Sequence, residues 1–491
     1  MKTTNCFFAG FLLFGVILLV SSGCKDFLTV APADELSREE TFSTLRGTNA
    51  AVVGIYLLLG DGNYYRDKML MYPEMAGNAQ PALRPGDNLP GTGPTANTYN
   101  EAYQFTYQPE YQDNTLGSFY DYLYRCLYQI NDVLANIDQL TEGSEAERNS
   151  LKGEALAMRA IVHFDLVRLF AQSPQFSSGA NHPGIVIADR LPQFTDQQDR
   201  ASVAEVYAFI EQDLAQAASL IDARYSQRSE GPFWLTSTVI TAYQARVAAY
   251  LQAWEAVIAF TNALLASPSP IQAAPALAPA DRYLEEWRTN QLSERIFALD
   301  LSRVTTPSSL GLSALIGAGI SEPVLNISSD LVALYPPEDL RRELLVMTGG
   351  GGTVSDKYRL DPGNTRLPDP ILLRTSELYL LRAEAYAALG RTAEAQADYN
   401  LIHQRANPGA INIDLESEAL QEAIRTERRR ELALEGHYLF DLSRWGQPVD
   451  RDACLEFVLT CDLDYPDYRY ALPIPQAAIF NNPNLVQNEG Y

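Results

Sequence analysis

Apolar residues recur at helical spacing along most of this chain, and the pattern predicts a mainly helical protein. After Ser202, for example, the apolar positions form one broad stripe that ends near Ile221. Ser37, Ser144 and Ser202 each stand three residues before a glutamate, which is the capping-box pattern of a helix start. We expect further helices over residues 116–140, 236–252, 254–267, 375–389, 392–406 and 417–435.

Two pairs of these helices carry small residues where the helices would cross. Alanines recur over residues 242–249, before Trp254, and again over residues 383–397, on both sides of Gly390. Small side chains let two helices approach closely, as in tetratricopeptide hairpins, but the chain has no strict repeat of about 34 residues. We therefore expect helical hairpins that alternate with irregular insertions, and not a regular solenoid.

Three segments show no helical periodicity, namely residues 60–114, 267–320 and 347–370, apart from a strand-like piece at 295–301. Loops of this length in a compact protein are usually functional or disordered. Residues 61–128 hold 11 of the 27 tyrosines. Tyrosine pairs an apolar face with a hydroxyl, which suits sugar rings and extended peptides. Tyr99, Tyr103 and Tyr107 are therefore candidate ligand contacts, although any single tyrosine is more often one that packs the loop onto the helices.

The first residues of the chain indicate export. Lys2 precedes an uncharged apolar run over residues 7–20, and small residues lead into Cys24. This layout predicts a signal peptide over residues 1–23, because the apolar run is too short to span a bilayer comfortably. A cysteine directly after small residues favours acylation of Cys24 and a lipid anchor. The alternatives are ordinary cleavage or an uncleaved anchor, with Cys24 unmodified in both cases.

Composition narrows the possible functions. The net charge of −24 argues against binding to nucleic acid or anionic lipid, both of which need clustered Lys and Arg. Cys126 lies in an apolar helical stretch and is expected to be buried. Cys454 and Cys461 are close in sequence and could form a disulfide in an oxidising compartment.

The usual catalytic and metal-binding motifs are absent from the sequence. It contains no HExxH, GxSxG, Walker or dinucleotide-binding motif, and its four histidines lack metal-binding spacing. We therefore expect no catalytic residues, no metal and no cofactor, although a hydrolytic carboxylate pair hidden in the loops is a further alternative. The charged residues over 424–437 are expected to form ion pairs along and between helices.

Several motifs, in a fixed order, resemble those of one family. They are Cys24-Lys-Asp-Phe-Leu with Pro32, residues 124–131 and 154–170, the segment from Arg374 to Tyr386, the segment from Glu427 to Gly446, Leu472-Pro-Ile-Pro, and residues 482–491. In this order they are similar to the SusD/RagB family of outer-membrane lipoproteins. The resemblance covers residues 24–491.

The resemblance implies a single SusD-like domain over residues 24–491, with an N-terminal part to about residue 230 and a C-terminal part from about residue 231. It implies tetratricopeptide-like helical hairpins, a lipid anchor in the outer membrane and exposure at the cell surface. It also implies a partner, a SusC-like TonB-dependent transporter. To this transporter the protein would deliver an oligosaccharide or, as the alternative, a peptide.

The resemblance also adds candidate ligand residues. The segment from Pro73 to Asn78 is similar to one that usually ends in Asp and lies close to ligand in some members, so Asn78 is a candidate without the charge. Arg84 could supply hydrogen bonds nearby. Loop 304–323 lacks the stacking aromatic residues of some members. The candidates near it are Tyr283, Trp287 and Arg303, and Trp287 could also simply pack.

Overall fold

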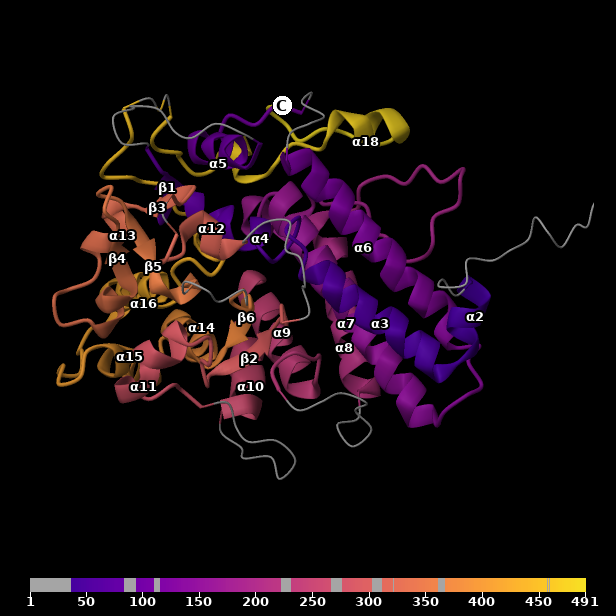
Figure 1. Ribbon diagram of the computed structural model, residues 1–491, viewed down its shortest axis with the longest axis horizontal. Helices are drawn as coiled ribbons and strands as arrows, with labels where there is room; N and C mark the ends of the chain where they lie inside the picture. The colour runs from indigo at the N-terminus through magenta and orange to yellow at the C-terminus, as the bar shows by residue number, and fades with distance from the viewer. Residues whose placement is uncertain are drawn as a thin grey trace, which may run out of the picture.

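The computed structural model describes residues 37–83, 94–109, 115–221, 231–265, 276–302, 311–320, 322–360, 367–456, 458 and 460–491. This part of the chain is mainly helical, as the periodicity predicts. Figure 1 shows the longer helices of the N-terminal half side by side on the right, and most of the C-terminal helices, with short strands among them, on the left. Successive helices pack against each other from one half into the other.

The N-terminal half is built mainly on helices, and three of them, α2, α7 and α8, start at their predicted capping residues. The helices are α2 (Arg38–Ser43), α3 (Leu45–Leu59), α4 (Lys68–Met71), α5 (Pro94–Gln104), α6 (Thr115–Ile137), α7 (Glu145–Phe170) and α8 (Val203–Leu220). The side chains of Ser37, Ser144 and Ser202 each accept the backbone N–H of the glutamate three residues on. Each glutamate accepts the serine N–H in return, so all three capping boxes are confirmed.

The C-terminal half contains the two predicted hairpins. Its helices are α9 (Ser237–Tyr250), α10 (Trp254–Leu265), α11 (Ala280–Arg288), α12 (Leu312–Ile316), α13 (Ser329–Ala333), α14 (Thr375–Ala388), α15 (Thr392–Ala406), α16 (Ser417–Glu431), α17 (Tyr438–Trp445) and α18 (Gln476–Asn481). Helix α9 pairs with α10 and α14 with α15, while α10 also packs on α14. The alanines at these crossings are largely buried, which allows the close approach.

Short strands form pairs, two of which connect segments that are far apart in the sequence. The strands are β1 (Ala79–Pro81), β2 (Arg295–Ala298), β3 (Leu325–Ile327), β4 (Leu345–Met347), β5 (Thr353–Ser355) and β6 (Ile371–Arg374). They form three antiparallel pairs, β1 with β3, β2 with β6, and β4 with β5. The segments expected to be irregular therefore contain regular structure, namely helices α4, α5, α11 and α12 and the strands β1, β2 and β5. Strands β1 and β2 pair with distant segments, which periodicity cannot reveal, and β5 forms a short hairpin with β4.

One apolar core reaches from Val52 to Leu485 and includes helices of both halves. Cys126 lies in it, fully buried on α6. Cys454 and Cys461 form a disulfide, as the sequence suggested. Among the described residues, no helix combines the length and the apolar character that crossing a membrane would require.

Candidate functional site

The candidate tyrosines do not form an exposed loop platform. Tyr99 and Tyr103 lie on helix α5, inside a segment expected to be irregular, and Tyr107 follows that helix. Their exposed fractions are 2%, 1% and 4%, so their rings offer no face on which a ligand could stack. The interpretation as loop residues was wrong for Tyr99 and Tyr103, because a spacing of four places them on one face of a helix, and that face is buried. Tyr107 does lie in a loop, but its ring is buried as well.

Asn78 also lies in the interior. Its Nδ2 donates to Glu74 Oε2 at 2.7 Å, and its Oδ1 accepts from Arg429 Nε at 2.8 Å. Glu74 accepts the backbone N–H groups of Leu434, Gly436 and His437. With 1% exposure, Asn78 links the start of β1 to the C-terminal helices and does not face solvent. Asn78 therefore cannot contact a ligand at the surface in this structure.

Tyr283 and Trp287 are buried on α11, against a cluster of charged residues. The Arg405 guanidinium lies 4.1 Å from the ring centre of Tyr283, and the Lys357 ammonium lies 4.8 Å from that of Trp287. Both rings pack, so neither can stack on an external ligand in this structure. Arg84 and Arg303 lie outside the described residues, as do Cys24 and the predicted signal peptide.

The charged cluster has Glu431 at its centre. Its Oε1 lies 2.5 Å from Arg374 Nη1 and 2.5 Å from Arg405 Nη2, and its Oε2 lies 2.7 Å from Arg341 Nη1. Although burial opposes ionisation, these three guanidiniums lower the pKa of Glu431 well below its ordinary value. The cluster joins α16 to β6, α15 and the segment before β4, which confirms the predicted ion pairs within and between elements.

A group of buried polar atoms near α4 and α5 lacks partners. Arg66 Nε, Asp67 Oδ1, Tyr99 OH and Asn100 Oδ1 have no hydrogen-bond partner among the described residues. We call these four residues the Asp67 cluster. Burial raises the pKa of Asp67, and burial together with the Asp67 charge raises that of Tyr99. An unpaired buried polar atom costs about 1–3 kcal/mol, so native structures rarely keep one without a reason.

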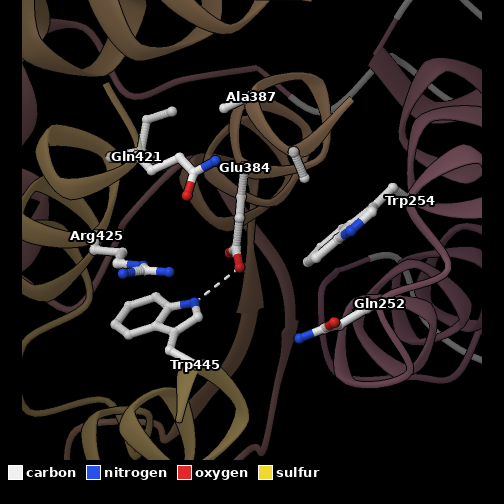
Figure 2. Close-up of a pocket in the computed structure, with 9 residues that line it drawn as sticks. Gln252, Trp254, Glu384, Ala387, Gln421, Arg425 and Trp445 are labelled. Carbon is white, nitrogen blue, oxygen red and sulfur yellow. Dashed lines mark hydrogen bonds between the residues drawn. The ribbon is translucent and has the colours of Figure 1, made fainter. Parts of the chain in front are cut away.

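A second candidate site is a pocket between the two hairpins that holds two tryptophans (Figure 2). We call it the two-tryptophan pocket. It encloses about 410 Å³, including space open to solvent. Its walls come from the turn after α9 and from α10, α14, α16 and α17. The lining residues are Gln252, Trp254, Glu384, Ala387, Ala388, Gln421, Ile424, Arg425 and Trp445.

Glu384 fixes one wall of this pocket. Its Oε1 accepts from Arg444 Nη1 at 2.6 Å and from Trp445 Nε1 at 2.8 Å, and its Oε2 accepts from Arg444 Nη2 at 2.8 Å. The carboxylates of Glu384 and Asp441 raise the pKa of Arg444, although burial alone would lower it. Figure 2 shows Trp254 and Gln252 across the pocket from Trp445, with Glu384 between them.

The sequence carries only a weak sign of the two-tryptophan pocket, which was not predicted. The available signal is that two of the four tryptophans stand at helix ends, Trp254 at the start of α10 and Trp445 at the end of α17. Within the part of the chain that the structure describes, no three His, Cys, Asp or Glu side chains are placed to hold a metal ion.

Comparisons with known proteins agree with this fold. A family model described as "SusD family" matches residues 355–491, and one described as "Starch-binding associating with outer membrane" matches residues 72–249. A SusD-like protein of Formosa agariphila is 23% identical over the whole of both chains. The chain belongs to the SusD/RagB family. The family is one of binding proteins, so this member is a binding protein and not an enzyme.

Other proteins are similar to this SusD-family protein in sequence or in fold. The starch-binding protein SusD of Bacteroides thetaiotaomicron is 34% identical over 122 residues, which are 24% of this chain and 21% of that protein. A putative sugar-binding protein of Bacteroides vulgatus has a TM-score of 0.78 at 24% identity, covering 91% of this chain and 99% of its own. A SusD superfamily protein of Bacteroides thetaiotaomicron has the same TM-score and coverage at 23% identity. These structures confirm the predicted SusD-like helical fold.

Proposed function

We propose that this protein captures an oligosaccharide at the outer membrane and passes it to a SusC-like TonB-dependent transporter. The observation that carries the proposal is the SusD-type fold, which covers 91% of the chain at a TM-score of 0.78. Several relatives with this fold are named for binding starch, sugar or carbohydrate. The description of one matching family model includes association with the outer membrane, which supports anchoring through an acylated Cys24.

The Asp67 cluster is the proposed capture site for this ligand. Its four residues supply a guanidinium, a carboxyl, a phenol and an amide, each with an atom that lacks a partner among the described residues. Sugar hydroxyls both donate and accept hydrogen bonds, so a saccharide suits these groups chemically, but because the four atoms are buried it would reach them only if the surrounding side chains rearrange on binding. Arg84 and Arg303 remain candidate contacts to the same ligand.

Calorimetric titration of the purified protein with oligosaccharides of different linkages tests the proposal. Loss of the Asp67 carboxylate in Asp67→Asn should weaken binding about tenfold, which corresponds to roughly one hydrogen bond to a charged group. Asp281→Asn, an exposed carboxylate on α11, is the matched control and should bind like the wild type. Binding to peptides but to no saccharide would refute the carbohydrate proposal.

The transporter partner is tested separately, by purifying the tagged protein from outer membranes under mild detergent. A TonB-dependent barrel should copurify in fixed ratio and should be lost from Cys24→Ser preparations, where the anchor is missing. A protein that is recovered alone from membranes under these conditions would contradict the partnership.

A further inference from the structure

The turn between α9 and α10 contains an unusual residue for its backbone conformation. Gln252 has φ = 55°, in the left-handed region that side chains other than glycine avoid. The N–H of Gln252 donates to Ala249 O at 3.1 Å, and the N–H of Ala253 donates to Ala248 O at 2.9 Å. These two hydrogen bonds form a Schellman motif, whose left-handed position is usually taken by glycine.

The second hairpin makes the same turn with glycine. Between α14 and α15, Gly390 has φ = 71° and donates to Ala387 O at 3.1 Å, and Arg391 donates to Tyr386 O at 2.8 Å. The two turns therefore have the same hydrogen bonds, and only one of them holds a strained side chain. Strain of this kind persists where the surrounding structure holds it, and it concentrates at functional sites.

The strained residue lines the two-tryptophan pocket. Figure 2 shows the Gln252 amide directed into the pocket beside Trp254. The amide makes one long hydrogen bond, from Nε2 to Arg444 O at 3.4 Å, so its oxygen is not used by the described residues. The turn therefore places an amide where glycine would leave the pocket without one.

Two further polar groups line the pocket. Gln421 and Arg425 lie one turn apart on α16, and neither side chain makes a hydrogen bond to any residue that the structure describes. The Arg425 guanidinium lies 5.5 Å from the ring centre of Trp445 and 3.9 Å from the Glu422 carboxylate, which is largely exposed. The pocket thus offers two amides and a guanidinium around half-buried indoles.

We propose that the two-tryptophan pocket binds a pyranose unit of a neutral saccharide, at a position separate from the Asp67 cluster. The C–H face of a pyranose packs on indole, and its hydroxyls pair with amide and guanidinium groups at the edges. The charges balance locally, because Glu384 pairs with Arg444 and Glu422 with Arg425, which favours an uncharged ligand.

This inference rests on the proposed carbohydrate ligand, and the test separates the two. The wild type and its variants are titrated by calorimetry with methyl pyranosides and with neutral oligosaccharides of different linkages. Gln252→Gly removes the amide while relieving the strained turn, so the variant should fold at least as well as the wild type. It should bind about tenfold more weakly at one of two sites, and Trp254→Ala should abolish that site.

Trp234→Ala is the matched control. Trp234 lines a separate, mostly apolar hollow beside α3, with its ring 5.1 Å from Tyr56 in an edge-to-face contact. This variant should keep both sites. Unchanged stoichiometry and affinity in Gln252→Gly and Trp254→Ala would overturn the pocket proposal alone. A wild type that binds no saccharide would overturn both proposals, as would peptides that bind the pocket in place of sugars.

Discussion

Removing one partner from the charged cluster around Glu431 should strongly destabilise this protein, because it leaves buried arginines without their counter-charge. Glu431→Gln keeps the shape of the side chain but removes the charge that Arg341, Arg374 and Arg405 share at 2.5–2.7 Å. An amide has one accepting oxygen, and its NH₂ group would face guanidinium donors. Breaking a buried ion pair on one side costs about 3–5 kcal/mol, and Glu431 is completely buried. That is a large fraction of a typical unfolding free energy of about 5–15 kcal/mol.

Urea unfolding followed by far-ultraviolet circular dichroism at neutral pH measures this cost. The Glu431→Gln midpoint should fall clearly below that of the wild type. Glu394→Gln is the matched control, because Glu394 pairs with Arg391 on the surface, where both side chains are more than 40% exposed. The control should show no measurable change. A Glu431→Gln midpoint equal to the wild-type value would refute the argument that the shared carboxylate holds the three arginines in the core.

Three further predictions follow from single residues. Gln252→Gly should raise the thermal midpoint, since it removes about 1–2 kcal/mol of left-handed strain at a cost of about 0.4–1 kcal/mol in unfolded-chain entropy; a lower midpoint would contradict this. Arg341 lowers the pKa of Glu427 to about 2, against burial, from an ordinary value of 4.5. The ionised Glu427 should therefore contribute fully to the free energy of unfolding above about pH 4.5, and this contribution, up to about 3 kcal/mol, should be lost as the pH falls toward 2. The Glu427→Gln variant should lack this part of the loss of stability in acid. Cys24→Ser should abolish the acyl group, detected by mass spectrometry of the mature protein, and release it from the membrane fraction; an acylated variant would disprove the assignment.

Local signals in the sequence were enough to predict most of the helical body. The capping serines at 37, 144 and 202 and the two alanine-rich hairpins depend only on neighbours a few residues away. The pairing of β1 with β3 joins residues 79–81 to 325–327, and short strands of three residues carry too little pattern to reveal it. Helix α5 was missed because its buried face is made of tyrosines, which composition alone associates with binding surfaces.

The candidate sites could be predicted less well than the fold. Whether Tyr283 and Trp287 stack on a ligand or pack inside depends on Arg405 and Lys357, which come from distant parts of the chain. The two-tryptophan pocket is assembled from both hairpins, α16 and α17, so no short segment encodes it. The strain at Gln252 was likewise hidden, since a glutamine after an alanine-rich helix is unremarkable until the turn is known.

The burial of Cys126 has a consequence for how this protein oxidises. Beyond Cys24 the chain has three thiols, Cys126, Cys454 and Cys461, and three thiols can pair in three ways. Burial raises the pKa of the Cys126 thiol to about 12, so the folded protein keeps it out of thiolate exchange. Once α6 has packed and buried Cys126, Cys454 can pair only with Cys461. If α6 packs before the thiols are oxidised, the Cys454–Cys461 disulfide forms without the help of an isomerase.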